Sequence, residues 1–440
     1  MLNFPNSTIM CRIEHAPKLW VDQRTEGFAQ SPTILPVGVA MATQKKLLAS
    51  RPQIALVKMS EQSVQQRITG ALADEIGARP ATSTAEARAA AVIAAQMRQV
   101  GLEVGVQTFS AAAAPTAGLG LLAAIGLLAL GLGWWFPYPS VALIALLLLL
   151  AGRELHGPPV LAGLLRQRPS QNVIGTRAAT RTPRARIVLL CHLDSPRMLS
   201  PRRASWLRVW LLTIPFGFSL SLIALGVAIF LPAWHSVLLI PAFFLLLSLV
   251  VVVRREWKAD WTVGAVDAAA VGTAIALAAD WPQRDDVELW VVALGAGAAA
   301  GSGIQALLNT YPFPKAETWF VNLPWLGRGN LTIVAGEGLW RERKPDPQLT
   351  KMFHELQSAS APLIRSAYRG ERLDSARLLA MGYHAVSVVG LKSDGTAAGF
   401  RQPDDETRLL SVPQMELALR VLRRVLDRFA RSHSNEPQLP

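Results

Sequence analysis

The chain has 440 residues, of which 51% are hydrophobic and only 17% are charged. Soluble domains carry roughly 25% charged residues, so this composition indicates a membrane protein. The net charge of +13 would suit nucleic acid or anionic lipid. The sequence has no helix-turn-helix, zinc-finger or aromatic-basic strand motif, so we expect arginines that flank membrane helices and no nucleic-acid partner. Cys11 and Cys191 are too few for a disulfide framework.

The N-terminal segment, residues 1–58, mixes charges, prolines and short apolar pieces without periodicity. Its apolar stretch "ILPVGVAMA" follows acidic residues instead of a clean basic region, so we predict no signal peptide. We expect this segment to be disordered, or to result from the choice of start codon, with Met41 or Met59 as alternative starts.

Residues 59–115 begin the folded part of the chain. In "TAEARAAAVIAAQMRQVGLEV", apolar residues recur at spacings of three and four, which predicts a helix that Thr84 caps and Gly101 ends. The stretch "EVGVQTFS", which follows directly, is predicted to be a strand.

Two long stretches without any charged residue follow, from Glu103 to Arg153 and from Arg208 to Arg254. Each is long enough for about two membrane crossings and a turn. The proline-containing turns "PYPS" and "LPAWHS" break each stretch near its middle. We therefore predict transmembrane hairpins at residues 116–152 and 207–253, four spans in all. The alternative is a buried pair of helices in a soluble protein, which the length of the uncharged stretches disfavours.

The basic residues predict an orientation for these hairpins. The two turns carry no Lys or Arg, whereas Arg153, Arg208 and Arg254 lie at the opposite ends of the stretches. By the positive-inside rule, the soluble parts face the cytoplasm. We thus expect a multi-pass protein of the inner membrane, with the lipid bilayer as a partner. His235 is the only ionisable side chain within the stretches, which disfavours a transporter.

The soluble pieces at residues 153–206 and 254–430 alternate strand patterns with helix patterns, and residues 431–440 form a tail. Strands are predicted at "NVIGTRAA", "RARIVLLCHLDS" and "DVELWVVALG", and helices at "GAVDAAAVGTAIALAADW" and "SVPQMELALRVLRRVLDRFA". This alternation predicts an α/β sandwich around a mostly parallel sheet, interrupted by the two hairpins.

One predicted strand, "IVLLCHLDS", ends in a His-x-Asp turn made by His192 and Asp194, a combination typical of metal sites. Together with "NVIG", "GAVDAAAVGTA", "VNL" and "PDDE" in this order, the pattern resembles the co-catalytic zinc aminopeptidases of metallopeptidase family twenty-eight. This group also holds glutamate carboxypeptidase and the transferrin receptor. The resemblance covers about residues 60–115 and 170–430. It implies an aminopeptidase-like three-layer sandwich with two zinc ions at the carboxyl ends of the strands.

Three residues match the family's metal centre. The resemblance implies that His192 is a zinc ligand and that Asp267 of "GAVD" is the carboxylate that bridges both ions. Asp194 matches the carboxylate that orients the histidine ring.

Elsewhere the sequence departs from the family. The region of the expected Glu-Glu pair is "ALGAGAAAGSG", and no Asp or Glu occurs from Leu289 to Ala316. Pro324 stands where the family has its next ligand, and Arg401 or Gln402 stands where it has its last one. Zinc takes three or four protein ligands, so with two ligands and no general base the sequence predicts no zinc or weakly bound zinc.

Ordinary structural roles are open for the same residues. His192 would cap the end of its strand through hydrogen bonds, and Asp267 would be a helix N-cap. Cys191 is expected to be a small buried strand residue. His354 lacks the second histidine of a His-Glu-x-x-His motif, and His384 is expected to be structural.

Two functions follow from this pattern. The first is a non-catalytic membrane protein whose peptidase-like domain binds a peptide or protein partner or serves as a scaffold. The second is an active zinc exopeptidase, an aminopeptidase with a rebuilt metal site that recruits Asp404, Asp405 or Glu317.

Overall fold

The computed structural model divides into two units, Met1–Ser60 and Glu61–Pro440. It describes residues 63–114, 116–156, 161, 167–198, 201–258, 260–337, 342–356, 363–368, 370 and 373–434, all in the second unit. The predicted disordered segment 1–58 lies outside these residues, as does most of the tail at 431–440.

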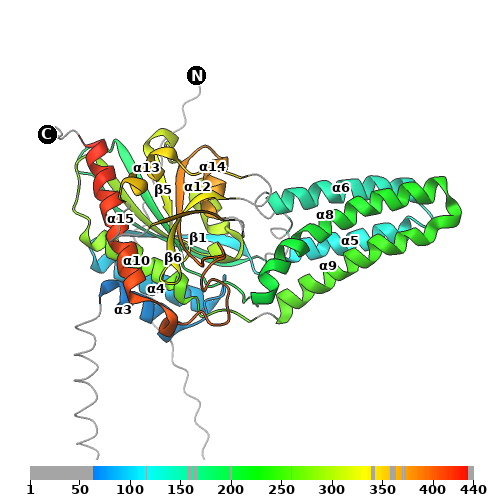
Figure 1. Cartoon of the computed structure of the whole chain (residues 1–440), viewed down its shortest axis with the longest axis horizontal. Helices are drawn as coiled ribbons and strands as arrows, with labels where there is room; N and C mark the ends of the chain where they lie inside the picture. Colours follow the sequence, from blue (N-terminus) through cyan, green and yellow to red (C-terminus); the bar gives the residue numbers. More distant parts are fainter. Residues whose placement is uncertain are drawn as a thin grey trace, which may run out of the picture. The chain divides into compact units, whose positions relative to one another are not determined.

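An eight-stranded sheet forms the centre of the described part (Figure 1). The strand order is β1-β2-β4-β3-β5-β8-β6-β7. Strands β3, β4, β5 and β8 run parallel to one another, and β6 and β7 form a further parallel pair. The pairs β1–β2, β2–β4 and β6–β8 are antiparallel. This confirms the predicted α/β class with a mostly parallel sheet. The strand bounds are β1 Glu103–Ala112, β2 Gln167–Arg177, β3 Ala185–His192, β4 Val287–Leu294, β5 Thr318–Asn322, β6 Asn330–Glu337, β7 Ile364–Tyr368 and β8 His384–Leu391.

Alternating side chains of the central strands pack into two hydrophobic cores, one on each face of the sheet. In β3, Ile187 and Leu189 join one core, while Val188 and Leu190 join the other. Side chains of successive strand residues point to opposite faces, so a strand buried on both faces is apolar throughout. The continuous run "IVLLC" is thus explained by a sheet that is covered on both sides.

Helices cover both faces of the sheet and complete a three-layer arrangement. The first core is packed by α3 Val64–Gly70, α4 Thr84–Gln99, α10 Ala265–Asp280, α13 Pro347–Glu355 and α15 Val412–His433. The second is packed by α12 Ser302–Thr310 and α14 Asp374–Ala380. Short helical segments are η1 Ala71–Ile76, α11 Gly297–Ala300, η3 Lys315–Glu317 and η4 Thr407–Leu409. The cap of α4 is Ser83, whose side chain accepts from Glu86 N, and not Thr84 as predicted.

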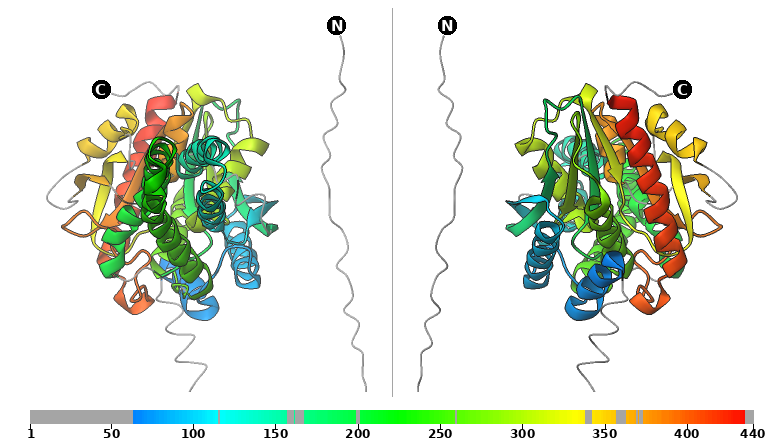
Figure 2. Two further views of the ribbon diagram at one scale, coloured as in Figure 1. Left: turned by 90° about the vertical axis from the view of Figure 1, so that its right-hand side faces the viewer. Right: turned by 90° about the vertical axis from the view of Figure 1, so that its left-hand side faces the viewer.

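The two uncharged stretches form four helices that pack side by side with their own apolar core (Figures 1 and 2). They are α5 Ala117–Leu132, α6 Pro137–His156, α8 Pro201–Phe230 and α9 Leu239–Lys258, with η2 Pro232–Leu238 at the second turn. Three helical stretches are long and apolar enough to cross a membrane: Pro137–Leu155, Thr213–Phe230 and Pro232–Trp257. Helix α5 has 16 residues, or about 24 Å, less than the roughly 30 Å of a hydrocarbon core.

A polar junction joins these helices to the loop after β3. Arg197 forms an ion pair of 3.0 Å with Glu256 near the end of α9, and both side chains are largely buried. Arg197 also donates to the carbonyl oxygens of Arg255 and Glu256, both at 3.0 Å. Thr116, which precedes α5, donates to the Glu256 carboxylate through both its backbone N and its hydroxyl. The loop that begins at His192 is therefore fixed to the apolar helices.

Candidate functional site

The candidate residues lie at the end of the sheet where the carboxyl ends of β3, β4 and β5 meet. These strands are parallel neighbours, and they end at His192, Leu294 and Asn322. Ligands of open α/β sheets bind outside the carboxyl ends of the strands. The functional site of this fold is therefore expected at the carboxyl ends of these strands.

His192 lies between two carboxylates, one on each side of its ring. Its Nε2 is 2.8 Å from Asp374 Oδ2, and its Nδ1 is 3.8 Å from Asp267 Oδ1. The side chain is only 6% exposed. Burial by itself lowers the pKa of His192, but the two carboxylates outweigh it and raise that pKa to about 10. Asp374 and Asp267 therefore both favour the protonated form of His192.

Asp374, which sequence analysis missed, is the closest partner of this ring. It is the first residue of α14 and lies 182 positions after His192. An acidic residue in the first turn of a helix is common because it complements the helix dipole, so nothing in the sequence marked this one out. The resemblance predicts Asp194 as the carboxylate that orients the ring; in the structure, Asp374 contacts its Nε2.

Asp267 lies in the first turn of α10 and is fully buried. Gly264, in the left-handed conformation, precedes the helix as its N-cap, so the N-cap alternative for Asp267 is wrong. Neither carboxylate oxygen of Asp267 has a hydrogen-bond partner among the described residues. Desolvation of such a carboxylate is costly unless charges nearby compensate for it.

Arg79 supplies part of that compensation and was also missed by sequence analysis. Its guanidinium is fully buried and donates to the carbonyl oxygens of Leu193, Leu72, Gly77, Val263 and Gly264 at 2.8 to 3.1 Å. Burial lowers the pKa of Arg79, while the negative charges of Asp267, Asp405 and Asp194 raise it. One arginine thus joins the loop after β3, the start of α10 and the loop before α4.

The loop after β4 takes the place of the expected Glu-Glu pair. Asp194 Oδ1 accepts hydrogen bonds from Gly297 N at 2.8 Å and Ala298 N at 3.1 Å. These bonds hold the loop against His192 so closely that a Cβ on Gly297 would lie 2.7 Å from Cδ2 of the ring. Burial raises the pKa of Asp194 to about 6, although the charge of His192 acts in the opposite direction. The lack of a side chain at Gly297 therefore leaves space for the His192 ring.

The two other positions that depart from the family also lie near this end of the sheet. Pro324 is buried and follows the end of β5. Arg401 has a positive φ of 60° and is 5% exposed, and its Nη2 donates to Ala298 O at 2.9 Å. The guanidinium of Arg401 is therefore fixed beside the same loop that Asp194 holds.

The three acidic residues considered as replacement ligands lie in different surroundings. Glu317 belongs to η3, which precedes β5 and so lies at the amino end of the strands, away from the site. Asp404 is half-exposed and pairs with Arg328 at 3.0 Å. Asp405 is buried and accepts from Val266 N at 3.0 Å. Burial and the charge of Asp267 raise the pKa of Asp405 to about 7, so it is the one that approaches the site.

Solved structures that resemble this chain are zinc aminopeptidases and glutaminyl cyclases. A zinc aminopeptidase from Bacillus subtilis has 14% sequence identity and a TM-score of 0.48. The match covers 83% of this chain and 94% of the aminopeptidase chain. A glutaminyl cyclase from Fimbriiglobus ruber has 13% identity and a TM-score of 0.48, with coverage of 82% and 93%. A Zn-dependent exopeptidase from Parabacteroides distasonis has 11% identity and a TM-score of 0.46, with coverage of 83% and 96%.

Neither a protein-family model nor a curated protein matches the sequence.

The described contacts of His192 do not by themselves form a zinc site. Asp267 and Asp374 lie beside different nitrogens of the ring, so no single ion is bound by His192 and both carboxylates. An ion beside Nε2 would have His192 and Asp374 as its ligands, and zinc takes at least three. Among the described residues, no three His, Cys, Asp or Glu side chains are placed to hold a metal ion.

Proposed function

We propose that this chain is a membrane-embedded protein whose zinc-aminopeptidase-like domain has lost catalysis and binds a peptide or protein partner. The observation that carries the proposal is the closed Asp267–His192–Asp374 cluster. Nε2 of His192, a ring nitrogen available to a metal, is taken by Asp374 at 2.8 Å. His192, Asp267 and Asp374 are all buried, so a peptide has no surface there on which to bind.

The electrostatics of the cluster support the same proposal. A ligand histidine must be neutral, because metal and proton compete for the same nitrogen lone pair. The two carboxylates raise the pKa of His192 and so favour its charged form over the neutral one. The guanidinium of Arg401, bonded to Ala298 O, adds a further positive charge beside the loop.

Membrane embedding is supported by the three long apolar helices, α6, α8 and α9. We propose that α5 crosses with them, which gives four spans in two hairpins. We further propose that the α/β domain faces the cytoplasm of the inner membrane, because the flanking arginines lie at its end of the helices.

Zinc content tests the loss of catalysis directly. The full chain would be purified in mild detergent, dialysed briefly and analysed for zinc per chain by elemental mass spectrometry, alongside hydrolysis of a chromogenic aminoacyl anilide. We expect no stoichiometric zinc and no hydrolysis above that of the His192→Ala variant. The matched control is His384→Ala, which removes a histidine that pairs with Asp346 outside this cluster.

A rebuilt metal site is the second candidate, favoured by one observation. Both oxygens of Asp267, Oδ2 of Asp405 and Nδ1 of His192 are buried without hydrogen-bond partners among the described residues. Unpaired buried polar atoms call for an explanation, and a bound ion is one. Firm binding of one or two zinc ions, with hydrolysis that His192→Ala abolishes and His384→Ala preserves, would establish this candidate and refute the loss of catalysis.

A further inference from the structure

The outer edge of β1 is an open edge of the sheet. β1 pairs with β2 on one side, and none of the described strands pairs with its other side. In an edge strand, every second residue turns its N–H and C=O groups outward, so ten residues present about five such sites. Proteins protect open edges with charges, prolines or bulges. From Gly105 to Ala112 the strand has none of these, and Val106 is 50% exposed.

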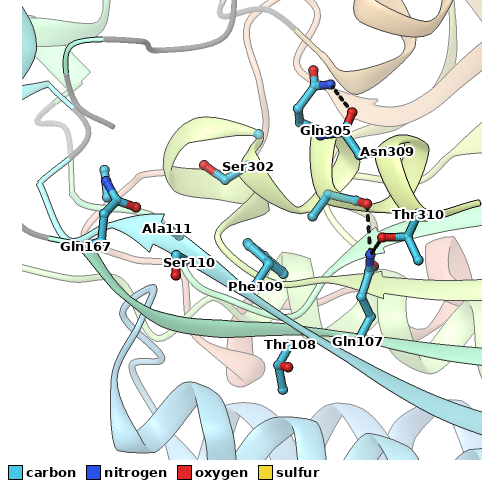
Figure 3. Close-up of a pocket in the computed structure, with 13 residues that line it drawn as sticks. Gln107, Thr108, Phe109, Ser110, Ala111, Gln167, Ser302, Gln305, Asn309 and Thr310 are labelled. Atoms are coloured by element: carbon cyan, nitrogen blue, oxygen red, sulfur yellow. Dashed lines mark hydrogen bonds between the residues drawn. The ribbon is translucent and has the colours of Figure 1, made fainter. Parts of the chain in front are cut away.

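A pocket of about 380 Å³ lies between β1 and helix α12 (Figure 3). Gln107 fixes its wall, because its Nε2 donates to Ala306 O at 2.8 Å and to Thr310 Oγ1 at 2.7 Å. Oε1 of the same side chain accepts from Asn172 on β2 at 2.8 Å. These bonds join helix and strand, so the pocket is already formed before anything binds.

The chemistry of this pocket is polar and uncharged. None of its 13 lining residues is charged, in a chain whose net charge is +13. Hydroxyl and amide groups are supplied by Gln167, Ser302, Gln305 and Asn309. Such a lining offers donors and acceptors to a peptide backbone and to neutral polar side chains, but no counter-charge to an ionised group.

The pocket also lies close to the first apolar hairpin. Two of its lining residues, Ala112 and Gln167, are the last residue of β1 and the first of β2, between which α5 and α6 are inserted. From Ala112 to the start of α5 at Ala117 the chain spans at most about 17 Å. A segment bound along β1 therefore ends near the apolar helices.

We propose that the β1 edge and this pocket bind an extended, uncharged polypeptide segment of another protein, which adds to the sheet as an outer strand. Backbone hydrogen bonds along β1 would provide affinity, and the pocket would select neutral polar side chains. This rests on the proposed binding role of the domain and names the chemistry of its partner.

The test uses the full chain in mild detergent and a dye-labelled, end-blocked peptide of ten Thr, Val and Gln residues. Fluorescence anisotropy measures its binding, and hydrogen exchange measures protection of the β1 amides. Ser302→Arg, which places a charge in the pocket from a half-buried position on α12, is expected to weaken binding by at least ~10-fold. Leu409→Lys, at a residue 43% exposed that does not line the pocket, is the control and should bind as the parent does.

Saturable binding that slows exchange in β1 and is weakened in Ser302→Arg would support the proposal. An absence of binding up to about 1 mM peptide, or equal binding by Ser302→Arg, would overturn it. Protection of the outward-facing β1 amides without peptide would overturn it too, in favour of a second copy if the protein is dimeric and of this chain's own segments if it is monomeric. None of these results depends on zinc or hydrolysis, so the outcome is separate from that of the lost-catalysis test.

Discussion

Glu337 makes the stability of the fold depend on pH in a direction that can be worked out. It ends β6, is 3% exposed, and its Oε2 accepts from the Ser375 hydroxyl at 2.9 Å. Burial, followed by the negative charge of Asp374, raises the pKa of Glu337 from 4.5 to about 7, although Ser375 and Arg343 act in the opposite direction. The folded state therefore binds a proton at mildly acidic pH that the unfolded state releases.

A carboxyl with a raised pKa stabilises the folded protein below its unfolded pKa, and that contribution is lost as the pH rises through the folded value. For Glu337, the pKa values of 4.5 and about 7 give about 2.5 kcal/mol more stability at about pH 5 than at about pH 8. This corresponds to a difference in unfolding temperature of about 5 °C.

Thermal unfolding of the full chain in mild detergent, followed by tryptophan fluorescence, would measure this effect. Glu337→Gln is expected to reduce the pH dependence of the unfolding temperature by about 5 °C, by raising the unfolding temperature at the higher pH. Glu317→Gln, an exposed substitution of the same kind, should leave the pH dependence unchanged. A Glu337→Gln variant with the full pH dependence of the parent would refute the assignment of a raised pKa to Glu337.

Two further substitutions test the packing and the charges around the site. Gly297→Ala is expected to lower the free energy of unfolding by about 1–3 kcal/mol, because its Cβ would lie 2.7 Å from Cδ2 of His192. The control is Gly105→Ala, whose Cβ would meet no atom within 4 Å. Equal unfolding temperatures for the two variants would contradict this reasoning. Arg79→Met is expected to lower the free energy of unfolding by about 3–5 kcal/mol, because it leaves the charges of buried carboxylates uncompensated. Denaturant unfolding would measure this loss, with Arg88→Met at an exposed position as the control. A loss no larger than that of the control would refute the role of Arg79.

Sequence alone predicted most elements of the fold because their signals are local. The run "IVLLC" is apolar throughout, and the structure places it in a strand buried on both faces. The helix ended by Gly101 follows its spacing of apolar residues, and Gly101 has a positive φ of 79°. The uncharged stretches became four apolar helices, although the helix from Ala117 to Leu132 is too short to be counted with the three long ones.

The candidate site was only partly predictable. His192 and Asp267 were found because a motif places each at the end of a strand or the start of a helix, and the structure brings them within 3.8 Å of each other. The absence of acidic residues after β4 was also visible in the sequence. That Gly297 gives the ring its space was not visible, because the close contact exists only between two folded loops.

The sequence by itself determined the α/β alternation, the apolar helices and the departure from the zinc aminopeptidase pattern, since each depends on neighbouring residues. Only the tertiary structure decided what surrounds His192. Asp374 lies 182 positions away, and Arg79 reaches the site from the loop before α4. Their roles depend on burial, which strengthens charge interactions and removes competing water. Burial is a property of the assembled fold and leaves no local mark on the sequence.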